Sequence, residues 1–218
     1  MKTITVKGMG RVSVKPDWIA IAIRLETKDK EYDKTMNAAA ERIECLDQTL
    51  EEAGFDKKAV KTTNFNVRTE SEHVKDKNGS YQSVFAGYVC THHLKIEFDF
   101  DTKRLAKVLS AISHCLAVPE FSISFTVKDP AAINGDLLKS AAQNAKEKAE
   151  ILCSASGVKL GELVSIGYDW GEIDVRSDTD YKIEGRCMMQ AEACLSNIEI
   201  EPDDIRVNDT ATFVWEIQ

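Results

Sequence analysis

The sequence of 218 residues predicts an α+β protein. Several segments alternate apolar and polar residues with a period of two, and three longer segments repeat apolar residues every three or four positions. From residue 12 to residue 127 these segments follow the order strand, helix, strand, strand, helix, strand, which is the split β-α-β arrangement. We expect one domain over residues 1–218 with the order β-β-α-β-β-α-β-α-β-β. Its sheet is expected to be antiparallel, with the helices packed on one face.

The first two expected strands cover residues 4–14 and 18–27. Gly8 and Gly10 interrupt the first strand and favour a bulge or bend between two short pieces. The second strand is apolar on both faces, which predicts a central position in the sheet.

A helix is expected between about residues 30 and 53, because its apolar residues form one stripe and Gly54 follows as a stop. Strands over 59–71 and 88–100 then form a long hairpin, with a turn at Asn78–Gly79.

Two aspartates mark the starts of the remaining helices. Asp101 or Thr102 caps the second helix, and Asp129 followed by Pro130 starts the third. The third helix has a mostly alanine apolar face, including Leu138 and Leu152, which predicts close packing against a sheet or another helix. An alternating strand over 121–127 lies between the two helices, and strands over 160–170 and 210–217 complete the fold.

The charge is concentrated in one segment. The chain carries 28 Lys and Arg against 36 Asp and Glu, a net charge of −8, which argues against nucleic-acid binding and against binding to an anionic membrane surface. Residues 172–209 hold eleven acids and four bases, so nearly the whole excess lies in this acidic excursion. Apart from a short helix expected around 186–195, its periodicity is weak, and we interpret it as an insertion.

The chain starts without the basic, apolar and small-residue sections of a secretory signal, and no stretch is apolar enough to span a membrane. These features predict a cytoplasmic protein with no membrane span. In the cytoplasm the six cysteines are expected to stay reduced, most of them buried. Cys187 and Cys194 lie in a polar segment and are the candidate redox thiols.

No motif predicts a catalytic residue, a cofactor or a metal. Cys90 and His92 share one strand face, but a structural zinc site needs four ligands. The acidic excursion lacks the spacing of a calcium-binding loop, and there is no nucleophile elbow. His114 and Cys115 are adjacent on a helix and therefore point about 100° apart.

Three segments resemble the SIMPL-domain family. The opening is similar in Gly8, Gly10, Pro16 and Asp17; an alanine-rich helix and the turn after it are similar in Lys148, Gly157 and Gly161; and residues 200–211 are similar to the family's final strand. That family includes periplasmic oxidative stress defence proteins, 26 kDa periplasmic immunogenic antigens and a eukaryotic protein that associates with a Pelle-like kinase.

The resemblance implies an α+β fold and self-assembly, since some relatives form ring-like or channel-like oligomers, and it implies no established reaction or cofactor. We therefore expect a non-enzymatic homo-oligomer with a stress-related or scaffolding role and an unidentified protein partner. One alternative is a ligand-binding protein or enzyme with a pocket between the sheet and residues 172–209. Another is a thiol redox sensor that uses Cys187 and Cys194.

Overall fold

The computed structural model describes residues 2–75, 81–169, 171, 173–179, 181–183 and 200–218. In this part of the chain α-helices accompany two antiparallel sheets, which confirms the α+β class. The chain divides into two compact units. The first unit comprises Met1–Asp17, Phe125–Thr179 and Pro202–Gln218, and the second comprises Trp18–Ser124 and Asp180–Glu201. A single domain over residues 1–218 stays a prediction.

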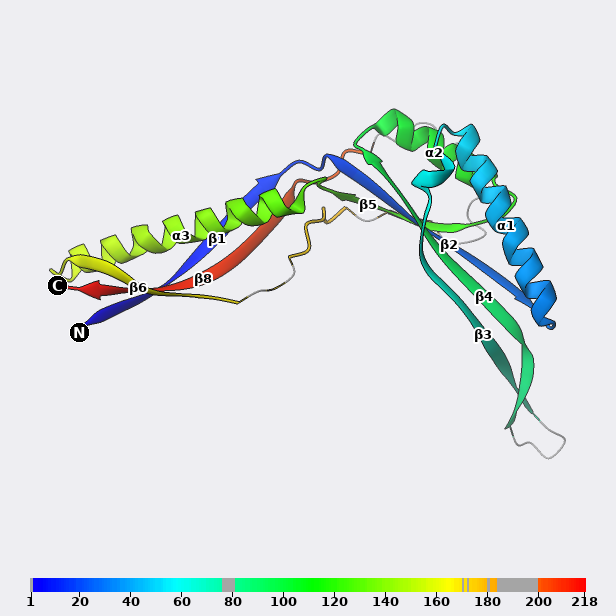
Figure 1. Cartoon of the computed structure of the whole chain (residues 1–218), viewed down its shortest axis with the longest axis horizontal. Helices are drawn as coiled ribbons and strands as arrows, with labels where there is room; N and C mark the ends of the chain where they lie inside the picture. The colour runs from blue at the N-terminus through cyan, green and yellow to red at the C-terminus, as the bar shows by residue number, and fades with distance from the viewer. Residues whose placement is uncertain (1, 76–80, 170, 172, 180, 184–199) are drawn as a thin grey trace. The chain divides into compact units, whose positions relative to one another are not determined.

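The first unit holds a sheet of order β1-β8-β6 with one long helix, α3, against it (Figure 1). These elements are β1 (Thr3–Val14), β8 (Ile205–Ile217), β6 (Leu160–Tyr168) and α3 (Pro130–Ala155). The β1–β8 register runs without a shift from Thr3 opposite Glu216 to Val14 opposite Ile205. The expected bulge at Gly8 and Gly10 is therefore wrong, because β1 runs through both glycines as one continuous strand.

The ends of α3 follow the sequence signals. The Asp129 side chain accepts a hydrogen bond from the Ala132 backbone N–H, and Pro130 occupies the first turn. The buried face consists of residues four apart: Leu137, Ala141, Ala145, Ala149 and Cys153. Leu138 and Leu152, which we expected on this face, are exposed instead. The buried stripe of α3 is narrow, with one residue in every four, because the helix contacts the sheet chiefly through β1 and β8.

The second unit contains the split β-α-β arrangement. Its sheet has the order β3-β4-β2-β5-β7, formed by β3 (Lys61–Lys75), β4 (Tyr81–Asp99), β2 (Trp18–Asp29), β5 (Glu120–Thr126) and β7 (Tyr181–Ile183). The chain adds α1 (Tyr32–Glu52), a short 3-10 turn (Lys57–Ala59) and α2 (Thr102–His114). The predicted central position of the second strand is confirmed, since β2 lies between β4 and β5.

One face of this second sheet is buried and the other is open. On β2 the buried side chains Ile19, Ile21, Ile23 and Leu25 alternate with exposed or half-buried ones, and Phe121 and Ile123 are buried on β5. The helix signals are confirmed here too: Gly54 takes a φ of +94° just after α1, and Asp101 caps α2.

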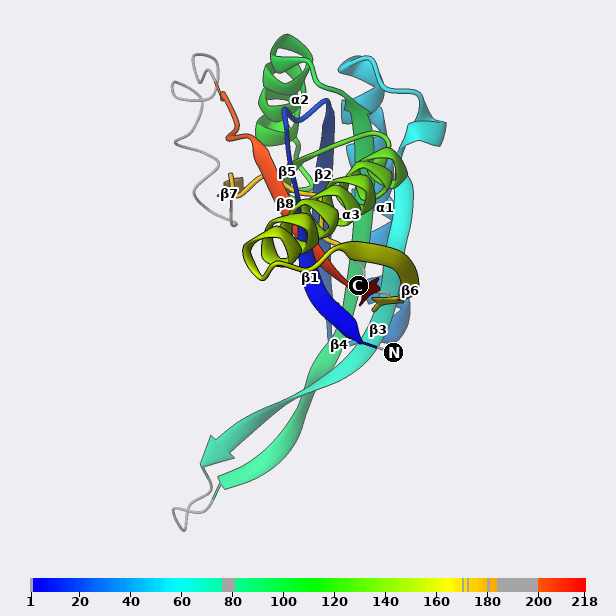
Figure 2. The ribbon, with the colours of Figure 1, turned by 90° about the vertical axis from the view of Figure 1, so that its left-hand side faces the viewer.

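The hairpin of β3 and β4 extends beyond the rest of its sheet (Figure 2). Residues of β2 pair with β4 only from Tyr88 to Asp99, so residues 71–75 and 81–87 form a two-stranded extension, the β3–β4 arm. The expected Asn78–Gly79 turn lies outside the described residues, as do the expected helix around 186–195 and both candidate redox thiols, Cys187 and Cys194.

Candidate functional site

Gly8 and Gly10 lie where α3 crosses β1 at very short range. A Cβ atom on Gly8 would lie 2.1 Å from the Ala141 carbonyl oxygen, and one on Gly10 would lie 2.1 Å from the Leu137 carbonyl oxygen. Real Cβ atoms essentially never approach other atoms this closely. Glycine is therefore required at both positions so that the helix backbone can rest directly on the strand.

The outer edge of β1 is covered by polar side chains of α3. Four helical residues rise about 6 Å and two strand residues about 6.6 Å, so every fourth residue of α3 meets every second residue of β1. We call these contacts the β1–α3 ladder. They are Arg11 N–H to Ser140 Oγ (3.3 Å), Met9 N–H to Asn144 Oδ1 (3.0 Å) and Lys148 Nζ to the Lys7 carbonyl oxygen (3.2 Å).

A polar groove of about 660 Å³ runs along this ladder. Its lining includes Ser140, Asn144 and Lys148, which already hydrogen-bond to the β1 backbone. A ligand there would have to displace contacts that hold the edge strand, so we assign these side chains to the architecture.

The other residues of the family motifs also fix the backbone. The Asp17 backbone N–H donates to the Thr126 carbonyl oxygen (3.1 Å), and the Asp17 carboxylate accepts from the Lys128 backbone N–H (2.8 Å). Pro16 directly precedes Asp17 in the connection from β1 to β2. Gly157 ends α3 with a φ of +72°, and a Cβ on Gly161 would lie 2.9 Å from the Glu216 Cβ. None of these contacts includes a reactive group.

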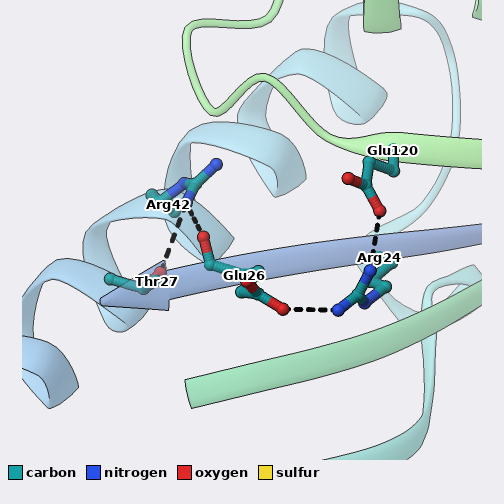
Figure 3. A network of polar contacts seen from close by, with 5 residues as sticks. All are labelled: Arg24, Glu26, Thr27, Arg42 and Glu120. Carbon is teal, nitrogen blue, oxygen red and sulfur yellow. Dashed lines mark hydrogen bonds and ion pairs between the residues drawn. The ribbon is translucent and has the colours of Figure 1, made fainter. Parts of the chain in front are cut away.

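The second unit carries a charged network on β2 (Figure 3). Arg24 forms ion pairs with Glu26 of the same strand and with Glu120 of β5, the second at 2.9 Å. Arg24 also lies directly opposite His93 of β4 in the strand register. The sequence signal for this network is an arginine directly after a run of alternating Ile and Ala over residues 19–23, and we did not predict a site from it.

A cavity of about 260 Å³ lies over the same region. Ala22 is small enough to leave space there, and Arg24, His93, Glu120, Ser122 and Lys182 contribute polar groups. Lys182 lies on β7, the strand that the acidic excursion adds to the sheet, and the other residues lie on β2, β3, β4 and β5. The arrangement can hold a small polar ligand, and it contains no cysteine and no paired nucleophile and base.

A second arginine of the network, Arg42, hydrogen-bonds to other segments of the second unit. Arg42 of α1 donates through Nε to the Ala117 carbonyl oxygen at 3.1 Å. Through a terminal nitrogen it donates to Thr27 Oγ1 at 3.4 Å (Figure 3). The next residue, Val118, has a φ of +43°, a conformation that β-branched residues rarely adopt. The Arg42 side chain thus holds the carbonyl just before this strained residue.

Cys90 and His92 are both buried on β4. Burial raises the pKa of the Cys90 thiol and lowers the pKa of His92, although Asp47 opposes the shift at His92. His92 Nε2 lies 2.9 Å from Thr62 Oγ1, and its Nδ1 is buried without a hydrogen-bond partner. Within the described ranges no three His, Cys, Asp or Glu side chains are grouped to hold a metal ion.

The fold and these sites define an α+β protein whose glycine-rich strand and alanine-rich helix interlock. Among the helices that the structure describes, none is long and apolar enough to cross a membrane. The family model SIMPL, described as a protein of unknown function (DUF541), matches residues 4–215. The chain therefore belongs to the SIMPL family, and the resemblance drawn from the motifs is confirmed.

Two relatives carry the name 26 kDa periplasmic immunogenic protein. The one from Brucella melitensis biotype 1 is 26% identical over 164 residues, which are 75% of this chain and 65% of the relative. The one from Brucella abortus matches with the same identity and coverage. The match thus spans less than two thirds of the length of these relatives.

Proposed function

We propose that this protein is a non-enzymatic member of the SIMPL family that assembles with copies of itself and has a scaffolding or stress-related role. The observation that carries this proposal is the contrast between the two edges of the sheet in the first unit. The β1–α3 ladder satisfies the edge of β1, whereas β6 has a neighbouring strand on one side only among the described strands.

The free edge at β6 is also apolar. Leu163, Val164 and Ile166 are large hydrophobic residues of β6, yet they are 47%, 45% and 57% exposed. Unpaired, apolar edge strands invite pairing with another chain, and proteins that stay monomeric usually protect such edges. A second copy of the same strand would supply both backbone hydrogen bonds and apolar contact.

The β3–β4 arm supports the same proposal. Two-stranded ribbons are marginally stable alone, because each strand has one partner and little buried surface. The arm nevertheless carries Val74, Tyr81, Val84 and Phe85, all of them exposed. Contact with another subunit would bury these side chains.

Light scattering coupled to size-exclusion chromatography tests the proposal at micromolar concentration. We expect an oligomer for the natural sequence and a smaller species for Ile166→Lys. Ile151→Lys is the matched control, because Ile151 is 67% exposed on α3 and receives the same charge away from the strand edge. A monomeric natural protein, or equal behaviour of both variants, would contradict assembly through β6.

A second candidate function is the binding of a small polar ligand in the cavity beside Arg24. The observation that favours it is the meeting of sheet residues with Lys182 of the acidic excursion around one hollow. Thermal-shift screening with metabolites tests it, because a bound ligand raises the apparent melting temperature. A shift for the natural protein that is lost in Ser122→Leu, which fills the hollow, supports binding; the same shift in both proteins refutes it.

The cellular location is a separate prediction. The two Brucella relatives are named as periplasmic proteins, whereas the sequence features of this chain predict a cytoplasmic protein. Fractionation of the cells that make this protein decides between the two compartments.

A further inference from the structure

Two cysteines from distant parts of the sequence meet in the second unit. Cys45 lies on α1, Cys115 follows α2 directly, and their Sγ atoms are 3.9 Å apart across a sequence separation of 70 residues. Disulfide sulfur atoms lie about 2.05 Å apart, so the two must approach by about 2 Å, which side-chain rotation and a small backbone adjustment supply.

The backbone around both thiols is held in place. The Cys115 N–H donates to the Ile112 carbonyl oxygen at 3.1 Å, and the Cys115 carbonyl oxygen accepts from the Val118 N–H at 3.0 Å. Arg42, one turn before Cys45 on α1, binds the Ala117 carbonyl oxygen. This contact ties α1 to the segment after Cys115, so the two sulfur atoms stay close together.

The two thiols differ in their surroundings. Cys115 is 6% exposed, and burial raises the pKa of its thiol, while Cys45 is half-buried. Thr49 on the next turn of α1 donates to the Cys45 carbonyl oxygen at 2.8 Å and also lies against the Cys115 thiol. Thr49 lines an open cavity of about 390 Å³ between α1 and α2, which gives a small oxidant a path toward the pair.

We propose that Cys45 and Cys115 are a modification site at which a hydroperoxide forms an intramolecular disulfide. The more accessible Cys45, as thiolate, attacks the terminal oxygen of the hydroperoxide; the O–O bond breaks, the alcohol or water leaves, and Cys45 becomes a sulfenic acid. Cys115 then attacks the Cys45 sulfur, the S–O bond breaks, and water leaves. In total, two thiols and one hydroperoxide give one disulfide, one water and one alcohol or second water.

Peptide mapping of the full chain tests this proposal directly. Trypsin releases Cys45 within residues 43–57 and Cys115 within residues 108–128, each as the single cysteine of its peptide. The reduced protein is treated with hydrogen peroxide, unfolded in urea with iodoacetamide, digested and analysed by mass spectrometry. We expect a linked pair of these two peptides and loss of Cys115 alkylation, both reversed by dithiothreitol.

Two alanine variants sharpen the result. In Cys45→Ala the linked pair must disappear and Cys115 must remain open to alkylation after peroxide. Cys153→Ala is the control, because Cys153 is a buried cysteine that lies on α3 in the first unit, and here the link must still form.

Three outcomes would overturn the proposal: alkylation of Cys115 unchanged by peroxide, accumulation of sulfinic acid at Cys45 beside a free Cys115, or a link from Cys45 to another cysteine. The mapping works on the natural protein, so it does not depend on the stability of any variant. It is also independent of the assembly proposed above, since it reads a covalent bond rather than a mass in solution.

Discussion

Replacement of Gly8 by alanine should separate α3 from β1. The added Cβ would lie 2.1 Å from the Ala141 carbonyl oxygen and 2.7 Å from the Ala145 Cβ. The Ala141 carbonyl oxygen belongs to the helix backbone, so no change of side-chain rotamer can relieve this clash. Ordinary van der Waals contact begins at 3.4 Å, so the helix must retreat by at least about 1.3 Å.

The expected cost follows from two contributions. Overpacking of a tight contact costs about 1–3 kcal/mol, and a backbone obstacle places Gly8→Ala at the upper end. Retreat of α3 also stretches the 3.0 Å hydrogen bond from the Met9 N–H to Asn144, which contributes about 1 kcal/mol. Alanine also lowers the conformational entropy of the unfolded chain, which stabilises the folded protein by about 0.4–1 kcal/mol. The net loss of stability is then about 3 kcal/mol.

Hydrogen exchange measured by mass spectrometry reads this loss locally. Because opening free energy is reported segment by segment, peptides from α3 can be compared with peptides from α1 in the other unit of the same sample. A loss of about 3 kcal/mol corresponds to roughly hundredfold faster exchange of the protected α3 amides. Exchange in α1 should stay unchanged.

Gly135→Ala is the matched control for Gly8→Ala. Gly135 lies within α3 and nothing stands within 4 Å of its missing Cβ, so alanine should stabilise the helix by about 1 kcal/mol. The same chemical change is thus expected to act in opposite directions at the two positions. If Gly8→Ala exchanges no faster than Gly135→Ala, the close approach of α3 to β1 is wrong.

Three further predictions concern single side chains. Asn144→Ala should cost about 1 kcal/mol and speed exchange of the Met9 amide, which would then have no partner on α3; unchanged exchange there would count against the ladder. Arg42→Lys should lower the urea midpoint by the equivalent of about 1–3 kcal/mol, because one ammonium cannot hold both the Ala117 carbonyl and Thr27. Because burial lowers the pKa of His92, the unfolded chain binds its proton first, near pH 6.5. That part of the stability is present above this pH and is lost as the pH falls through the lowered pKa of His92 in the folded protein; urea titrations should show the loss, and His92→Phe should reduce it.

Much of the fold could be predicted from the sequence, because local signals determine where elements begin and end. Asp101 and Asp129 cap helices as expected, and Gly54 and Gly157 follow helices with positive φ values. These residues act within a few positions along the chain, so their effect can be read from a short window.

The errors concern contacts between distant segments. A glycine in a strand looks the same whether it permits a bend or a close approach, and only the position of α3 decides for Gly8. We predicted too many residues on the buried face of α3, because the number buried depends on how much of the sheet the helix covers. The thiol contact of Cys45 with Cys115 was missed since 70 residues separate them and no local pattern joins them.

The place of β8 in the first unit bears on how this protein folds as it is made. It is the central strand between β1 and β6, and both depend on it for their backbone pairing. Within this unit β1 is translated before the other strands, so it waits unpaired until β8 (Ile205–Ile217) has left the ribosome. Residues 18–124 meanwhile contain most of their own pairings and can fold early. During that interval the nascent β1 has an uncovered edge, so the unit with the longest delay is also the one most open to chaperones and to mispairing.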